Sequence, residues 1–327
     1  MSAVQLASFP EELLERILAD AVVAPPTPHP RAPWHHPQPD DTKAVRTRLA
    51  PLLVCRAFHR IALPLFYHTL VLHTPSQSHA LLRTLRAQPG LARAVRTLVL
   101  VAPSPADADI LHLLCRTERL LALDVTLPTA SEGDTAPDAA FACALRSLRS
   151  LTDLVVRKGA GTYLSQPAAR AALEALADAV SSCPSLETTT LSFPLSADPT
   201  LVPLVAALAA APALHTLRTP LPAFWTLPLL TVSANPALAK ICLGDLPASA
   251  PACKDKGRPL LGTSLFLAAA RQHARLSELI RAGTAVLGWR GRAWTMGAGA
   301  YPPPPALQAG AKEREAPMFM GPGASSC

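Results

Sequence analysis

Three stretches of the sequence bring together residue types that can do chemistry. Cys55 and His59 lie four residues apart, which is one helical turn, and an imidazole at that distance can deprotonate a thiol. Residues 257–264 contain two glycines, Gly257 and Gly262, spaced as in a phosphate-binding loop. The histidines at positions 29, 35 and 36 are ligands of the kind that copper and nickel accept. Whether any of these stretches is a site depends on its neighbours.

None of the three stretches has the neighbours that its chemistry needs. The loop has no lysine after Gly262 to reach a phosphate, and Pro259 has no N–H to donate. The histidines lie in a proline-rich segment without acidic or thiolate partners, and ordering that segment around a metal costs conformational entropy. We expect Cys55 to be packed among apolar residues, where a thiol is inert. We therefore predict no catalytic residue, no metal site and no cofactor. An enzyme assembled from scattered loop residues is the alternative, which a deep polar pocket would support.

The elements near the N-terminus carry more apolar residues than one helical face can hold. A helix is expected over residues 10–22, with Pro10 in its first turn after Ser8 as the cap. Further helical segments are expected over residues 42–50 and from there to about residue 61, and Pro64 should end the last one. Surplus apolar surface rimmed by charge marks a docking site, so these helices indicate a module that binds a partner.

The same residues resemble an F-box. Residues 9–17, Phe-Pro-Glu-Glu-Leu-Leu-Glu-Arg-Ile, are similar to the opening pattern Leu-Pro-x-Glu-Leu/Ile-Leu-x-x-Ile, with phenylalanine in place of the first leucine. The later elements of the family resemble Val54-Cys55-Arg56, Phe58, Ile61-Ala62 and Leu65-Phe66-Tyr67. The resemblance covers residues 6–72, about a fifth of the chain, and is interrupted by an unusually long insert at 24–41.

The resemblance implies a partner and a role. F-box proteins dock on the Skp-type adaptor of a cullin–RING ubiquitin ligase, and the rest of their chain recruits the protein to be ubiquitinated. Each residue carried over by position either contacts the adaptor or seals the module's own core, and the sequence leaves both alternatives open. The adaptor-binding candidates are Pro10, Leu13, Leu14, Ile17, Leu18, Leu52, Val54 and Cys55.

Behind this module a Leu-x-x-Leu-x-Leu-like core recurs seven times. Its first positions are residues 67, 95, 120, 151, 186, 214 and 238, so the steps are 24 to 35 residues, as in leucine-rich repeats. The asparagine that usually follows the strand is missing in every unit. One strand and its return helix cannot bury their own apolar side, so several units must stack. Return helices are predicted over residues 76–86, 106–117, 138–147, 167–182 and 199–211.

These patterns predict an α/β protein, or α+β once the helical module is included. Residues 1–72 are the F-box-like helical module with its proline-rich insert at 24–41. Residues 73–283 form a degenerate leucine-rich-repeat-like solenoid, closed by a helix over 262–282, and residues 284–327 form a disordered basic tail. The alternative is an ordinary mixed α/β domain with leucine-rich strands.

The strand positions between the leucines should line a concave binding face. Their mixed charges favour a polar target of complementary charge, and the alternative is that many of them are only solvated. The predicted target-binding residues are Arg96, Asp124, Asp153, Arg157, Thr188, Arg218 and Lys240.

Charge, cysteine content and hydropathy limit the kinds of partner and the cellular compartment that we expect for this protein. Ten basic against four acidic residues from position 250 onward give +6 of the total charge of +7, which we interpret as a solvated end because no nucleic-acid-binding motif accompanies the charge. Seven scattered cysteines without a Cys-x-x-Cys pair favour a reducing compartment. No apolar run is long enough for a membrane span and no secretory signal opens the chain. We therefore expect a cytoplasmic and/or nuclear protein that binds neither nucleic acid nor membrane.

Together these features predict the substrate-recognition subunit of a Skp–cullin–F-box ubiquitin ligase, which tethers a target protein through its repeats. Catalysis would be positional, with no bond made or broken by this chain. The alternative is a solenoid protein-interaction scaffold with no ligase role.

Overall fold

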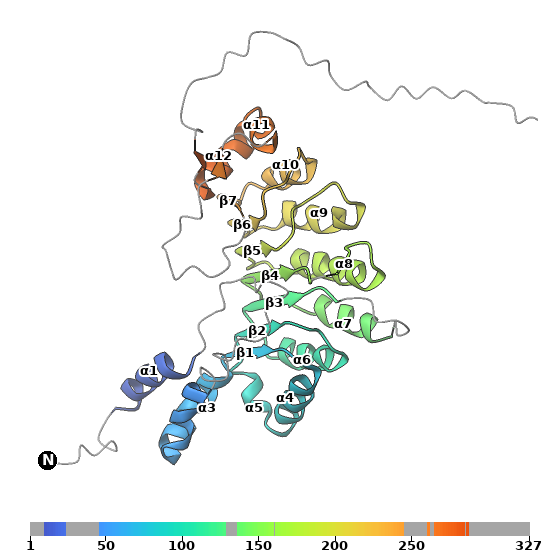
Figure 1. Ribbon diagram of the computed structural model, residues 1–327. Helices are drawn as coiled ribbons and strands as arrows, with labels where there is room; N and C mark the ends of the chain where they lie inside the picture. The colour runs from blue at the N-terminus through green and yellow to red at the C-terminus, as the bar shows by residue number, and fades with distance from the viewer. Residues whose placement is uncertain are drawn as a thin grey trace, which may run out of the picture. The chain divides into compact units, whose positions relative to one another are not determined.

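Seven parallel strands lie side by side in the order in which they occur along the chain (Figure 1). Each is short, and each of the first six is followed by a helix that returns the chain to the start of the next strand, as a parallel sheet requires. The strands are β1 (Thr69–Leu72), β2 (Thr97–Leu100), β3 (Ala122–Thr126), β4 (Asp153–Arg157), β5 (Thr188–Leu191), β6 (Thr216–Thr219) and β7 (Lys240–Leu243).

The computed structural model describes residues 10–23, 46–128, 136–159, 161–244, 260–261, 265–284 and 286–287. They belong to one unit, residues 1–289, and the second unit, 290–327, lies outside the described residues. The predicted insert at 24–41, the glycine-rich loop except residues 260–261, and most of the predicted tail also lie outside them.

The register of the sheet aligns the middle residue of every predicted leucine core. The paired positions run across the sheet as Leu70, Leu98, Leu123, Leu154, Thr189, Leu217 and Ile241. All seven are buried, because alternate strand residues point to the same face and this face packs on the helices. All seven strands predicted from the sequence are therefore present, and the α/β class is confirmed.

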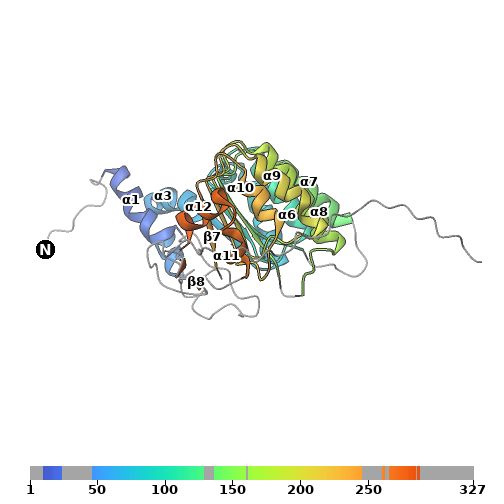
Figure 2. The same cartoon turned by 90° about the horizontal axis from the view of Figure 1, so that it is seen from above.

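The return helices form a second layer on one side of the strands, which Figures 1 and 2 show from two directions. Five predicted helices are present, and α8 has the predicted bounds, whereas α5 and α10 were not predicted. The helices are α4 (Pro75–Ala87), α5 (Pro89–Ala92), α6 (Pro105–Cys115), α7 (Ala136–Arg146), α8 (Pro167–Ser182), the 3-10 turn η3 (Pro199–Leu201), α9 (Val202–Ala210) and α10 (Leu227–Ser233).

The residues at the helix starts explain why these helices could be predicted from the sequence. Proline stands in the first turn of most of these helices, where its missing N–H has no helical acceptor. At α6 a capping box adds to this, because the Asp107 carboxylate accepts from the Ser104 backbone N–H at 2.6 Å and from the Ser104 hydroxyl at 2.8 Å. The residues that begin each helix thus determine where the loop after each strand ends.

The finer prediction of a leucine-rich-repeat-like solenoid is not confirmed. A solenoid stacks near-identical units, whereas these return helices range from 7 residues in α10 to 16 in α8. Proline, which has neither a side-chain amide nor an N–H to link one turn to the next, stands three residues after the last leucine-type core position in most units. These prolines are Pro75, Pro103, Pro128, Pro194 and Pro222. The structure shows one open parallel sheet covered by helices.

The N-terminal helices have a small hydrophobic core of their own. Helix α1 (Glu11–Val22) and helix α3 (Arg56–Tyr67) meet through the side chains Leu14, Leu18, Val22, Ile61 and Ala62. Between them lie a helical segment at 46–49 and the 3-10 turn η2 (Ala50–Leu53). The segment expected to start at residue 42 is thus described from residue 46 on.

Helix α3 continues through Pro64, which was wrongly predicted to end it. An interior proline costs about 3 kcal/mol. The helix persists because it is packed on two sides: Ile61 and Ala62 lie in the core of the helical module, while Leu63 and Tyr67 pack against the core of the sheet. Helix α3 therefore belongs to both cores and leads directly into β1.

The segment predicted as one closing helix over 262–282 contains two helices, α11 (Leu265–Ala270) and α12 (Ala274–Gly283). They are separated by a turn at 271–273, where His273 stacks on the Trp225 ring at 4.8 Å. Two short strands, β8 (Leu260–Leu261) and β9 (Val286–Leu287), pair with each other, so β9 forms within the segment predicted as a disordered tail.

Helix α12 covers the outer edge of β7, the last strand of the sheet. The Thr284 hydroxyl accepts from the Leu243 N–H at 2.8 Å and donates to the Ile241 carbonyl at 3.0 Å. These two backbone groups have no strand partner on that side, so the contact protects an edge that would otherwise pair with another chain. The predicted closing role of this segment is thus carried by α12 and Thr284.

Replacing Gly283 by alanine should destabilise the protein by about 1–3 kcal/mol, because a new methyl group would press on the backbone of β7. A Cβ at this position would lie 2.6 Å from the carbonyl carbon of Ile241. Unfolding followed by circular dichroism measures the loss. Gly90→Ala is the matched control, since a Cβ there meets nothing within 4 Å and should be neutral or slightly stabilising. Equal stability of the two variants would contradict the close approach of α12 to β7.

Candidate functional site

The face of the sheet away from the helices carries two rows of side chains in register. The first row is mostly polar and consists of Thr69, Thr97, Ala122, Asp153, Thr188, Thr216 and Lys240. The second row consists of Val71, Val99, Asp124, Val155, Thr190, Arg218 and Cys242. Most of the predicted target-binding residues lie on this face, so the strand alternation on which the prediction rested is correct.

Two of the predicted target-binding charges are bound to each other. Arg157 donates from Nε and a terminal nitrogen to the two carboxylate oxygens of Asp124, each at 2.6 Å. The Arg157 and Asp124 side chains are only 15% and 8% exposed. A bidentate pair of this kind neutralises both charges. The sequence predicted that each charge faces a target, whereas the two side chains face each other. The pair instead links β3 to β4 on the open face.

The other predicted target-binding residues are spread over the sheet and do not form one site. Asp153 is exposed on β4 and accepts from the Thr152 hydroxyl at 2.9 Å. Thr188 and Lys240 are half-buried in the same row, and Arg218 is exposed in the next row. Arg96 precedes β2 and donates to the Arg119 carbonyl at 3.4 Å, so it lies at the strand starts rather than on the face. Whether these residues bind a target stays a prediction.

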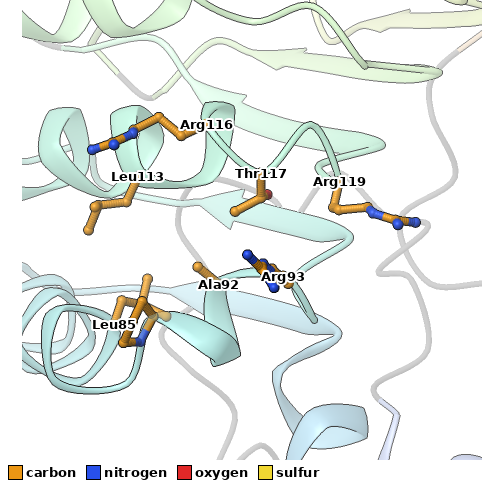
Figure 3. Close-up of a pocket in the computed structure, with 8 residues that line it drawn as sticks. Leu85, Ala92, Arg93, Leu113, Arg116, Thr117 and Arg119 are labelled. Carbon is orange, nitrogen blue, oxygen red and sulfur yellow. The ribbon is translucent and has the colours of Figure 1, made fainter.

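A cavity of about 560 Å³ lies where α5 and α6 end (Figure 3). Three of its lining residues are exposed arginines, and no carboxylate lines it. Figure 3 shows the three guanidinium groups pointing in different directions. The lining consists of Leu85, Pro89, Ala92, Arg93, Leu113, Arg116, Thr117 and Arg119.

Helix electrostatics account for the arginines of this cavity. Arg93 and Arg116 are the residues that cap the C-terminal ends of α5 and α6, where free carbonyl groups attract cations. The one hydroxyl, on Thr117, donates to the Leu114 carbonyl at 2.7 Å. The cavity therefore offers positive charge, but no paired acid and base and no activated nucleophile.

The cysteines do not form a reactive centre among the described residues. Burial raises the pKa of the Cys115 and Cys183 thiols, which keeps them protonated near neutral pH. Cys55 is exposed, contrary to the prediction that it is packed. It is the N-cap residue of α3, and its carbonyl accepts from the His59 N–H at 2.9 Å.

The helical module leaves part of its apolar surface uncovered. On α1, Leu13 is 48% and Ile17 is 58% exposed. Leu53, the last residue of η2, is 85% exposed, and the following Val54 is 60% exposed. Pro10 and Cys55 are exposed as well, and Leu52 is half-buried against the module's own core.

Two predicted adaptor contacts are corrected by this arrangement. Leu14 and Leu18 are buried against α3, because they lie one turn apart on the side of α1 that faces it. They seal the module and are not presented to a partner. Leu53, which the sequence analysis did not select, is the most exposed apolar residue of the module, and its place beside Leu52 and Val54 was the available signal.

Polar contacts fix α1 on α3 and so hold the exposed residues in place. Arg48 donates from Nε to the Val22 carbonyl at the end of α1, at 2.6 Å, and lies over the Phe66 ring of α3 at 5.1 Å. Burial lowers the pKa of Arg48. Arg60 of α3 donates to the Glu11 carboxylate at 2.8 Å, and this hydrogen bond raises the pKa of Arg60.

No protein-family model matches this chain, and no curated protein is significantly similar to it. Among the described residues, no group of three or more histidine, cysteine or acidic side chains is placed to hold a metal ion. The described helices include none that is both long and apolar enough to cross a membrane. The histidines at 29, 35 and 36 lie outside the described residues.

Removing one partner of the Asp124–Arg157 pair should cost roughly 3–5 kcal/mol, because the other charge is left buried alone. We expect Asp124→Ala to be more damaging than the double variant Asp124→Ala/Arg157→Ala, with the coupling measured by a double-mutant cycle in urea. Asp178→Ala, which breaks the exposed Arg146–Asp178 pair, is the control and should cost about 1 kcal/mol or less. Additive effects of the two Asp124–Arg157 substitutions would contradict the buried pair.

The stability of the protein should fall as the pH drops below about 6.5, in part because of His68. Burial and the neighbouring Arg96 cation lower the pKa of His68 from 6.5, and its Nδ1 is buried without a hydrogen-bond partner. As the pH falls through the unfolded-state pKa, His68 takes up a proton in the unfolded chain but stays neutral in the folded chain. The free energy of unfolding therefore decreases.

Urea denaturation of the wild type and of His68→Gln between pH 7.5 and 5 tests this expectation. The difference in unfolding free energy should shift in favour of the variant as the pH falls. His79→Gln, which removes an exposed imidazole on α4, is the control for the substitution itself. A wild-type and a His68→Gln curve that stay parallel over this range would rule out the contribution of His68.

Proposed function

We propose that this chain is the substrate-recognition subunit of a Skp–cullin–F-box ubiquitin ligase. The helical module would dock on the Skp-type adaptor, and the βα units of the parallel sheet would hold the target protein. The observation that carries the proposal is the exposure of Leu13, Ile17, Leu53 and Val54 on a module whose own core is already closed.

The four exposed residues form apolar surface beyond what the core of the helical module buries. Leu13 and Ile17 are one turn apart and make a ridge on α1. Leu53 ends the turn η2 and Val54 follows it, and this turn contacts both α1 and α3. Fully burying such side chains contributes roughly 1.5–3 kcal/mol each. The described residues of the module, 10–23 and 46–72, leave these four side chains largely uncovered, so a partner that covers them gains most of that energy.

The proposed role of the chain in the reaction is positional. A protein held by the βα units would stay close to the ubiquitin carrier of the ligase, which raises the effective concentration of its lysines. This role needs no catalytic residue in the chain, and we place it in the cytoplasm or the nucleus, where such ligases act.

The second candidate function is a protein-interaction scaffold without a ligase role. One observation favours it: Leu14 and Leu18, two of the residues carried over as adaptor contacts, are sealed in the module's core. In that case α1 and α3 would serve only to cover the β1 end of the sheet, through Leu63 and Tyr67.

Adaptor binding separates the two functions. The full chain should bind a purified Skp-type adaptor in isothermal titration calorimetry, and Ile17→Asp/Val54→Asp should weaken that binding at least tenfold, since each charge would be buried in the interface. Val202→Asp, at a residue of α9 that is 62% exposed, is the matched control and should bind normally. Failure of the wild type to bind would leave the scaffold function.

A further inference from the structure

The exposed large apolar residues of the described chain fall into two groups and one outlier. Four belong to the helical module, and Leu121 stands alone before β3. Single exposed apolar residues are normal on a protein surface. Several that lie on the same part of the surface form a patch, and such a patch marks a binding site. The second group follows strands β4 to β7 and consists of Tyr163, Val202, Phe224, Leu227 and Leu265.

The parallel topology brings this second group to one edge of the sheet. All seven strands run in the same direction, so they all end at one edge, which we call the carboxyl edge. Tyr163 lies between β4 and α8, Val202 opens α9 after β5, and Leu227 opens α10 after β6. Neighbouring strands are about 4.8 Å apart, so the connections after β4 to β7 spread over roughly 15 Å, the length of about five extended residues.

The connection after β6 is held by a stack of three rings. Trp225 stacks on Phe266 at 5.8 Å and 21°, and on His273 at 4.8 Å and 11°. Phe266 is fully buried, so the stack ties this connection to α11 and α12. Phe224 and Leu265 are the chain neighbours of the stacked rings and are nevertheless 70% and 66% exposed. The exposed pair therefore belongs to an ordered surface.

The charges of the carboxyl edge define what such a surface would bind. Lys158 and Asp198 are the only charged residues among the described positions of 158–166, 192–198 and 220–226. The Asp198 carboxylate is occupied, because it accepts from the backbone N–H and the hydroxyl of Thr200 at 2.9 and 2.7 Å. Lys158 is exposed, with its ammonium 6.0 Å from the Tyr163 ring. The described positions of these three connections thus offer apolar side chains and one exposed cation.

The backbone of these connections is poorly suited to pairing with a partner strand. Pro194, Pro220 and Pro222 lack the N–H that an added strand would need. Recognition must then rest on side chains, and exposed aromatic residues such as Tyr163 and Phe224 are the type that dominates binding energy at interfaces.

We infer that the carboxyl edge of β4 to β7 is the docking surface for the target protein, and that it binds an extended segment with apolar or aromatic side chains and a carboxylate that meets Lys158. The inference rests on the proposed function, which it deepens by assigning the target surface to this edge. It moves the target away from the open face, where Asp124 and Arg157 neutralise each other.

The test uses the full-length protein and a phage-displayed library of random 12-residue peptides. Selected peptides should share apolar or aromatic positions next to an aspartate or glutamate. In calorimetry with the synthetic peptides, Tyr163→Ser/Phe224→Ser should bind at least tenfold more weakly than the wild type. Leu13→Ser/Ile17→Ser is the matched control, since it removes equally exposed apolar residues from the helical module and should bind normally.

A charge exchange tests the part assigned to Lys158. Lys158→Glu should weaken the selected peptides at least tenfold, and the same peptides with lysine in place of their carboxylate should recover binding to that variant. Circular dichroism checks that the variants stay folded, and Val202→Ser provides a second variant of the patch.

Several outcomes would overturn the inference. They are a library that gives no binder, selected peptides that bind the Tyr163→Ser/Phe224→Ser variant as well as the wild type, or a consensus without acidic residues. A wild-type dimer that Phe224→Ser converts to a monomer in sedimentation would show that a second copy occupies the edge instead.

Adaptor binding of the same variants separates this inference from the proposed function. If Tyr163→Ser/Phe224→Ser binds the Skp-type adaptor normally and loses the peptides, both are supported. If the wild type binds peptides at the edge but no adaptor, the ligase role fails while the docking surface stands. If the adaptor binds and no peptide does, only the docking surface fails.

Discussion

The arrangement of the seven strands and their return helices depends on the column of aliphatic side chains between the sheet and its helices. Leu70, Leu98, Leu123 and Leu154 stand at paired positions on successive strands and are almost inaccessible to water. A single strand and helix cannot bury such a residue alone, so the units are stable only as a stack. Once the column fixes the register, strand alternation decides which side chains reach the open face, and the topology decides which connections share an edge.

The same column is the reason that most of the sheet could be predicted. A mostly leucine core with constant spacing inside each unit located all seven strands, and proline with alanine and leucine located α8 to the residue. Short elements were missed, since α5 and α10 have 4 and 7 residues and too little periodicity to be recognised. The break at 271–273 was missed for another reason: it coincides with the stacking of His273 on Trp225, almost fifty residues earlier in the chain.

The candidate sites were predicted less well than the fold, because their chemistry depends on neighbours that periodicity does not reveal. Leu14 and Ile17 look alike in the sequence, and only the position of α3 buries the first and leaves the second exposed. Asp124 and Arg157 were predicted as separate charges facing a target. Their pairing follows from the register, in which Arg157 stands two residues beyond the partner of Asp124, within reach of a long side chain.

The side chains at the starts of the strands differ from those at the carboxyl edge, where the strands end. Helix electrostatics explains the charged residues at the strand starts but not the exposed aromatic residues at the carboxyl edge. Where the strands begin, Arg93 and Arg116 cap the C-terminal ends of the preceding helices, where free carbonyl groups favour cations. The carboxyl edge meets the starts of helices, where the same reasoning favours acidic caps, and Asp198 provides one. Helix starts give no reason to expose Phe224 or Tyr163 to water. Their exposure is not required by the fold, and it is therefore the surface feature that most needs a partner to account for it.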